Sequence, residues 1–124
     1  MMYKNFFFEE AIYYAGGANA WRIWDLIGLQ SSTIPVAQKF DVFKTFFVHA
    51  FKTNVMIEYS QVTKTPIFSG NPPQVVVDRI FSDFPLDKLP DMRPENENAF
   101  IVYMVPKIDG WAVIEEGTTL IIPS

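Results

Sequence analysis

The amino-acid sequence predicts an α+β fold in which N-terminal helices pack on a small, mainly antiparallel C-terminal sheet. Three observations predict it: one long amphipathic segment, several shorter segments bounded by capping residues, and a C-terminal part with strand-like runs between turn residues. The length of 124 residues is near the commonest size of one domain, so we expect a single domain over residues 1–124.

The long amphipathic segment is residues 34–53. At about 100° per residue, its apolar side chains fall on one stripe and its polar side chains fall on the opposite side. This pattern predicts a helix that lies in the centre of the core and contacts more than one neighbour. The stripe contains Phe40, Phe43, Phe47 and Phe51.

Other helices with recognisable ends are predicted along the first two-thirds of the chain. Asn, Ser and Thr favour the residue before a helix, Pro its first turn, and Gly its end. The predicted helices are residues 6–15, capped by Asn5 and ended by Gly16 and Gly17; residues 20–27, capped by Asn19 and ended by Gly28; the long helix, capped by Ser32 or Thr33 with Pro35 in its first turn; and a helix that begins at Asn71 and ends at Pro85.

Strands are predicted after the long helix and in the tail. Residues 55–59 alternate as a half-buried strand does, and a second short strand is expected near residues 66–68. A strand is also predicted at 100–106, where the run from Phe100 to Val105 has no polar residue, as expected of a central strand that is covered on both faces. It is followed by an Asp109-Gly110 turn, a strand at 111–115, a Gly117 turn and a strand at 118–122, and it is preceded by a loop at 85–98 that contains three prolines.

The charge is distributed unevenly around a net value of −4. Residues 78–124 hold nine of the 14 acidic side chains and four of the 10 Lys and Arg side chains. An acidic half repels phosphate backbones and attracts basic proteins. We therefore expect no direct binding of nucleic acid, and we expect a basic protein partner or simply an acidic, soluble face.

Several classes of protein are disfavoured by composition. The chain has no cysteine, which excludes disulfides and thiol chemistry and is compatible with the cytoplasm. Glu9 and Glu10 interrupt the first apolar run, so no signal peptide is expected, and no run approaches 18 apolar residues, so no membrane-spanning helix is expected. We therefore predict a cytoplasmic protein that does not bind a membrane.

No catalytic, metal or cofactor motif is present. His49 is the single histidine, and Asp41, Thr45 and His49 share a helix face at a spacing of four residues. About 12 Å separate the first and last of these on a straight helix, which is too far for a catalytic triad. With one histidine and no cysteine there is no transition-metal site to propose. We predict a non-enzyme without catalytic, metal-binding or cofactor-binding residues.

The acidic surface of the C-terminal half is the best candidate for function. A long proline-containing loop is often functional, and a negative surface can attract a basic protein and select it by charge complementarity. Exposed aromatic residues such as Tyr103 or Trp111 could serve as anchors within it. The predicted partner-binding residues are Asp83, Asp87, Asp91, Glu95, Glu97, Asp109 and Glu115.

The order of the elements resembles a family of small bacterial immunity proteins, which occur beside polymorphic toxins and in contact-dependent growth inhibition. The likeness covers most of the chain but consists of packing patterns, so it assigns no role to any single residue. It lies in IWDLIG at 23–28, QKFDVFKTFF at 38–47, NVMIEY at 54–59, PPQVVVDRIFSDFP at 72–85 and FIVYMVPKIDGW at 100–111.

What the resemblance implies is a cytoplasmic antitoxin-like protein. It would bind the domain of a cognate toxin, often a basic nuclease, and occlude its active site. The alternative is another non-catalytic interaction module, such as a secretion chaperone or a phage-encoded adaptor, which a stable homodimer through the Phe-rich helix would favour. An enzyme would instead need a deep pocket with two convergent carboxylates or His49.

Overall fold

The computed structural model describes residues 6–84, 97–115 and 119–123. Helices form the N-terminal part and an antiparallel sheet lies toward the C-terminus, so the predicted α+β class is confirmed. The elements in chain order are α1 (Phe8–Tyr14), α2 (Ala20–Ile27), α3 (Val36–Lys52), β1 (Met56–Ser60), β2 (Thr65–Pro66), α4 (Pro73–Ile80), α5 (Glu97–Met104), β3 (Gly110–Glu115) and β4 (Thr119–Ile121).

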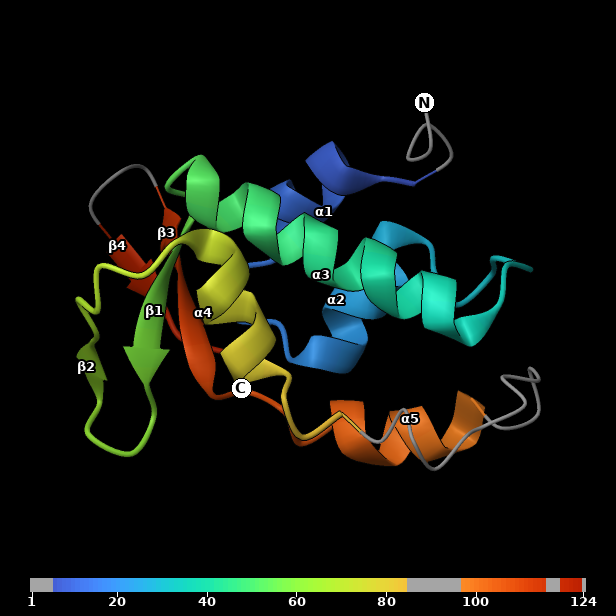
Figure 1. Ribbon diagram of the computed structural model, residues 1–124. Coiled ribbons are helices and arrows are strands. Elements are labelled where there is room, and N and C mark those ends of the chain that lie inside the picture. Colours follow the sequence, from blue (N-terminus) through green and yellow to red (C-terminus); the bar gives the residue numbers. More distant parts are fainter. Residues whose placement is uncertain (1–5, 85–96, 116–118, 124) are drawn as a thin grey trace.

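The sheet has the strand order β2-β1-β3-β4, and each neighbouring pair is antiparallel. Met56 pairs with Val113 and Glu58 pairs with Trp111, so these four side chains share one face, because side chains alternate along a strand. Figure 1 shows α3 and α4 beside the sheet, with α1 and α2 behind α3 in this view.

The aromatic core is centred on α3. Phe43 contacts Trp24 of α2 and Phe81 at the end of α4, with ring centroids 5.3 and 5.1 Å apart. Phe47 contacts Trp111 of β3 at 5.1 Å. Such aromatic pairs each contribute about 0.5–1.5 kcal/mol beyond the area they bury. The prediction that this helix contacts several neighbours in the core is confirmed.

The largest difference from the predicted structure concerns residues 100–106, which were expected to form a central strand. They lie in and just after the helix α5. A short apolar run is compatible with a buried strand and with a buried helix, and periodicity does not distinguish the two. The side-chain amide of Asn19 donates a hydrogen bond of 3.0 Å to the carbonyl oxygen of Val105, which follows the helix. Carbonyl groups at helix ends need such partners, and here the residue that caps α2 supplies one.

This change alters the connection before β3. The predicted Asp109-Gly110 turn does not join two strands, because α5 precedes it. Gly110 instead begins β3 with a φ of 119°, and a Cβ atom at this position would lie 2.9 Å from Cγ1 of Ile80. A side chain there would be strained by both the backbone and the contact. The predicted loop 85–98 overlaps α5 at its last two residues, and residues 85–96 lie outside the described part of the chain.

The helix ends are predicted well in one case and less well in others. Asn19 caps α2, accepting a hydrogen bond of 2.8 Å from the backbone N–H of Arg22, and Gly28 ends α2 in the left-handed conformation, as expected. The predicted cap at Asn5 lies outside the described residues.

The caps predicted for α3 and α4 are wrong. The N-cap residues are Pro35 and Pro72, in place of Ser32 or Thr33 and of Asn71. Proline has a fixed φ and no N–H to satisfy, so it suits the residue that leads into a helix as well as its first turn.

Candidate functional site

The structure describes part of the predicted acidic surface. Asp83 follows α4, Glu97 begins α5, Asp109 precedes β3 and Glu115 ends β3. The remaining predicted residues, Asp87, Asp91 and Glu95, lie outside the described residues.

Asp83 joins the end of α4 to α5. The hydroxyl group of Tyr103 donates a hydrogen bond of 2.6 Å to its Oδ1 atom, and the Nζ atom of Lys107 lies 3.6 Å from the same oxygen. Partial burial acts to raise the pKa of Asp83, but the Tyr103 hydrogen bond and the Lys107 charge outweigh it and lower that pKa. Burial and the nearby carboxylate raise the pKa of Tyr103. Asp83 is therefore ionised at neutral pH and already has partners within the chain.

Asp109 and Glu115 lie at opposite ends of β3. The Oδ1 atom of Asp109 accepts a hydrogen bond of 2.7 Å from the backbone N–H of Gln61, just after β1. Glu115 is exposed at the other end of the strand, roughly 20 Å away at about 3.4 Å per residue. Lys107 connects Asp83 to the end of the sheet where Asp109 lies. Asp109 and Glu115 are therefore separated by the length of β3, and Asp83, through Lys107, lies toward the end at which Asp109 is found.

The two aromatic residues predicted as exposed anchors lie in different environments. Trp111 is fully buried against Phe47 and Phe81, so its predicted role as a surface anchor is wrong. Its place on the covered face of the sheet follows from its pairing with Glu58, which a sequence pattern does not specify. Tyr103 is half-buried, and its hydroxyl group reaches Asp83.

A buried carboxylate that the sequence did not single out lies on β1. Glu58 is 8% exposed, and its Oε2 atom accepts a hydrogen bond of 2.6 Å from Nη2 of Arg79 on α4. Its Oε1 atom accepts a hydrogen bond from the hydroxyl group of Ser69, in the segment between β2 and α4. Both oxygens are thus satisfied, as burial of a charge requires. The feature of the sequence that could have indicated this buried carboxylate is an acidic residue between Ile57 and Tyr59 in a predicted strand.

Glu58 also lines a shallow hollow beside β1. Its volume is about 360 Å³, and its lining is mainly apolar. Phe68, at its rim, is 89% exposed. The lining residues are Phe51, Ile57, Glu58, Ile67, Phe68, Ser69, Gly70, Asn71, Pro73 and Val76.

A larger hollow of about 750 Å³ lies at the start of α3, against the segment before α1 and the connection from α2. This volume is within the range of small-ligand pockets. Asp41 is the charged residue among the described residues that line it. The lining consists of Phe6, Phe7, Gly28, Ser31, Ser32, Thr33, Ile34, Gln38, Asp41 and Val42.

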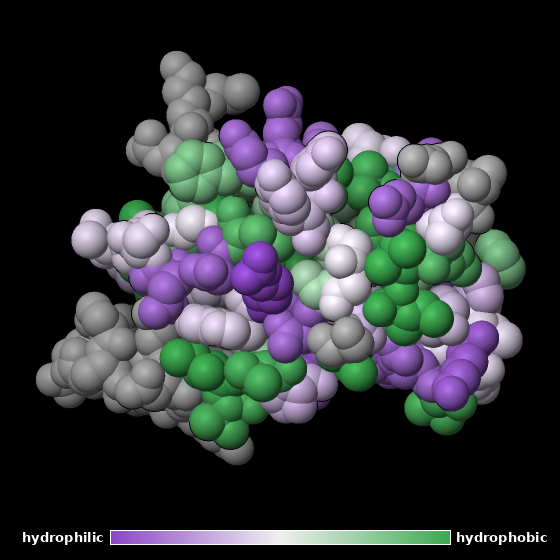
Figure 2. Space-filling view, turned by 180° about the vertical axis from the view of Figure 1, so that it is seen from behind, coloured by the Kyte–Doolittle hydropathy of each residue, from purple (hydrophilic) through white to green (hydrophobic). Residues whose placement is uncertain are grey.

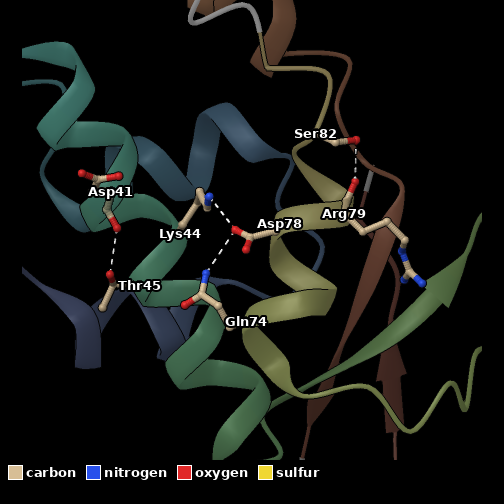
Figure 3. A network of polar contacts seen from close by, with 7 residues as sticks. All are labelled: Asp41, Lys44, Thr45, Gln74, Asp78, Arg79 and Ser82. Atoms are coloured by element: carbon tan, nitrogen blue, oxygen red, sulfur yellow. Dashed lines mark hydrogen bonds and ion pairs between the residues drawn. The ribbon is translucent and has the colours of Figure 1, made fainter.

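Polar contacts link α3 to α4 on the surface, as Figure 3 shows. The Oδ1 atom of Asp78 lies 2.5 Å from Nζ of Lys44 and accepts a hydrogen bond of 3.1 Å from Nε2 of Gln74. The Lys44 contact is the main reason that the pKa of Asp78 is lowered, although partial burial opposes it. These partly exposed contacts link the two helices.

The residues Asp41, Thr45 and His49 do not form a catalytic arrangement. The Thr45 hydroxyl group donates a hydrogen bond of 2.8 Å to the backbone carbonyl oxygen of Asp41, which is a common contact within a helix. His49 is exposed and lines neither of the two hollows. Each hollow is lined by a single carboxylate among its described residues, Asp41 in one and Glu58 in the other.

Apolar side chains are exposed on the face opposite that of Figure 1. Figure 2 shows them over α5 and over the β4 edge of the sheet, with hydrophilic side chains between the two groups. On α5 and just after it, Val102 is 77% exposed and Val105 is 46% exposed. Leu120 and Ile122 are partly exposed at β4. Exposed apolar side chains that gather on one element are a feature of interaction surfaces.

Within the described residues, no group of three or more His, Asp or Glu side chains lies close enough together to hold a metal ion. Among the helices described, none has the length and apolar character needed to cross a membrane. No family model, no curated protein and no solved structure matches the chain.

Proposed function

We propose that this chain is an immunity protein that binds and neutralises a cognate bacterial toxin domain in the cytoplasm of the cell that makes both. The class of toxin that fits best is a basic nuclease, because the C-terminal half of the chain is acidic. The protein would act by occlusion and would need no catalytic residue, metal or cofactor of its own. The resemblance of its packing patterns to immunity proteins supports the same function.

The observation that carries this proposal is the surface at α5. Val102 is exposed on the helix beside Tyr103, whose hydroxyl group contacts Asp83, and Glu97 begins the same helix. An exposed apolar side chain on a helix of the acidic C-terminal half is suited to a protein partner that has a basic rim. Asp87, Asp91 and Glu95, which lie between Asp83 and α5 in the sequence, carry further negative charge of the predicted partner-binding set.

The packing of α3 argues against a homodimer formed through its apolar stripe. Phe43 and Phe47 are fully buried against residues of their own chain. A dimer would therefore have to use another surface, such as the exposed residues of α5 or β4. The partner distinguishes an immunity protein from a secretion chaperone or an adaptor, because neither of these would neutralise the product of a neighbouring toxin gene by binding it.

The test is co-purification with the product of the neighbouring gene, followed by titration of the pure proteins at several salt concentrations. Reversal of charge at Asp87, Asp91 and Glu95 to Lys should weaken binding by at least about ten-fold and reduce its dependence on salt. Val102→Glu should weaken binding as well, since it places a charge at this exposed apolar position of α5.

Glu9→Lys on α1 is the matched control, because it reverses an exposed charge outside the predicted surface and should leave affinity nearly unchanged. Glu115→Lys reports whether the far end of β3 takes part in binding. If the charge-reversed protein keeps its affinity and salt dependence, the acidic surface is not the binding site. If no toxin-like partner binds, the immunity function itself is wrong.

A further inference from the structure

The larger hollow, at the start of α3, has a wall of aromatic rings that the backbone holds in place. Phe7 donates its backbone N–H to the carbonyl oxygen of Ile27 at 3.0 Å, which ties this segment to the end of α2. Its ring lies over Gly28, where a Cβ atom would approach the ring to 3.0 Å and where φ is 96°. Glycine is therefore required below the ring, while Phe7 is still 53% exposed toward the hollow and solvent.

The part of the lining that comes from α3 contains a carboxylate, that of Asp41. Among the described residues, no hydrogen bond or ion pair engages the side chain of Asp41, although its backbone carbonyl accepts from Thr45. Figure 3 shows the Asp41 side chain on the side of α3 away from α4, whereas Lys44 points toward Asp78. The nearest lysine of the same helix face is thus engaged elsewhere, and the negative charge of Asp41 is available to the hollow.

Neutral acceptors complete the lining. Ser31 donates its hydroxyl hydrogen to the carbonyl oxygen of Gly28, and the Ser32 hydroxyl oxygen accepts from the N–H of Ile34, which fixes the connection between α2 and α3. Thr33 and Gln38, whose side chains carry further oxygen atoms, also line this space. The hollow therefore combines aromatic rings, one negative charge and several oxygen acceptors.

We propose that this hollow binds the guanidinium group of an arginine side chain on a protein partner. A guanidinium group stacks on aromatic rings and donates in two directions to a carboxylate and to neutral oxygens, which this lining offers together. A phosphate or carboxylate would meet the charge of Asp41, and a lysine ammonium group would lack the planar face. The inference rests on the proposed function for the basic character of the partner, but it concerns a surface separate from α5.

The probe is the blocked amino acid N-acetyl-arginine-N-methylamide, titrated into the isotope-labelled protein and followed by the amide resonances in NMR spectra. N-acetyl-citrulline-N-methylamide is the matched control, since it has nearly the same shape and no charge. We expect saturable shifts confined mainly to residues 31–42, a millimolar dissociation constant, and binding of the citrulline compound weaker by about five-fold or more.

Asp41→Asn should reduce arginine binding to the level of the citrulline compound, and Phe7→Leu should weaken it by about two-fold to five-fold through loss of the ring. Asp25→Asn is the matched protein control, because Asp25 is an exposed acid of α2 that does not line the hollow. It should bind the probe as the unmodified protein does. Melting curves of each variant report that it is folded.

The proposal is overturned if the arginine probe causes no localised shifts at about 50 mM, if the citrulline compound binds equally, or if Asp25→Asn weakens binding as much as Asp41→Asn. It is also overturned if agmatine binds tightly while the blocked arginine does not, since the occupant would then be a small free guanidine and not a side chain of a protein. None of these outcomes depends on the toxin, so the proposed function and this site can fail separately.

Discussion

Two hollows of this molecule each contain a carboxylate, and the two carboxylates differ in what surrounds them. Glu58 is nearly buried, and its two oxygens are taken up by Arg79 and Ser69. Asp41 is exposed at the other hollow, and its side chain has no partner among the described residues. A buried charge has to be paired within the fold, whereas an exposed one can remain unpaired in water at little cost.

This difference separates residues that hold the fold from residues that are free to bind. Glu58 connects β1, the segment before α4, and α4 itself, so its contacts stabilise the fold and are not free for binding a partner. Asp83 and Asp78 are intermediate, because they are exposed but have partners. The carboxylates thus form a series, from Glu58 through Asp83 and Asp78 to Asp41, in which the expected effect on stability decreases.

The largest effect is expected for Glu58→Ala. The change leaves Arg79 and Ser69 without their acceptor and opens space beside β1, so we expect the free energy of unfolding to fall by about 3 kcal/mol. Urea unfolding followed by circular dichroism measures it. Glu58→Gln, which keeps the size and one acceptor, should cost less. A loss below about 0.5 kcal/mol for Glu58→Ala would show that the buried carboxylate does not hold these elements together.

The next effect is expected for Tyr103→Phe. It removes the hydroxyl group that donates to Asp83, so we expect a loss of about 1 kcal/mol in the free energy of unfolding. Tyr13→Phe is the matched control, because Tyr13 is exposed on α1 and should tolerate the change. Equal stability of the two variants would mean that the contact between α4 and α5 contributes nothing measurable.

Lowering the pH should reduce the free energy of unfolding through Asp83 and Asp78, the two exposed carboxylates that have partners. The pKa values of Asp83 and Asp78 are lower in the folded protein than in the unfolded chain. Their contribution to stability is therefore present above the unfolded pKa of about 3.9 and is lost as the pH falls through the folded values. Between about pH 4 and pH 2, the protein with both residues changed to Asn should lose less stability than the unmodified protein. Parallel curves would contradict the lowered pKa values.

A smaller effect is expected for the pair of Lys44 and Asp78. Both side chains are partly exposed, so a double-mutant cycle with Lys44→Met and Asp78→Asn should give a coupling energy of about 0.5 kcal/mol, smaller at high salt. A coupling energy above about 2 kcal/mol would mean that this exposed pair stabilises the fold as strongly as a buried pair such as Glu58 and Arg79. The difference in burial would then not explain the difference in stability.

The smallest effect on stability is expected for Asp41→Asn. Its side chain is exposed and unpartnered, so the free energy of unfolding should change by less than about 0.5 kcal/mol. The same variant should lose binding of the arginine probe. A clear loss of stability would show that Asp41 stabilises the fold as Glu58 does, and the predicted difference between the two carboxylates would be wrong.

Much of the helical part could be predicted from the sequence. The bounds of α2 follow from Asn19 and Gly28, and the position of α3 follows from its apolar stripe, because caps and periodicity act over a few neighbouring residues. The strands β1, β3 and β4 lie within one or two residues of the predicted runs for the same reason. The run that became α5 was misassigned, because its sequence is apolar on every side and suits either structure.

The candidate site depended more on the fold. The sequence indicated an acidic C-terminal half. The structure shows that the predicted site residues Asp109 and Glu115 lie at the two ends of β3 and are not close together. The hollow at α3 combines residues from before α1, from the connection after α2 and from α3, and no local pattern shows that these meet. Trp111 had the character of a surface anchor in the sequence and is a core residue in the structure.

Composition and the spacing between near neighbours were sufficient to predict the class of fold, the positions of α2 and α3, and the sign of the charge in the C-terminal half. Only the packed chain shows that residues 97–104 form a helix, that Glu58 is buried with Arg79 and Ser69, and that Asp41 lines the same hollow as Phe6 and Phe7. The physical reason is that burial and pairing of a side chain depend on residues that are distant in the chain and become neighbours only when the core forms.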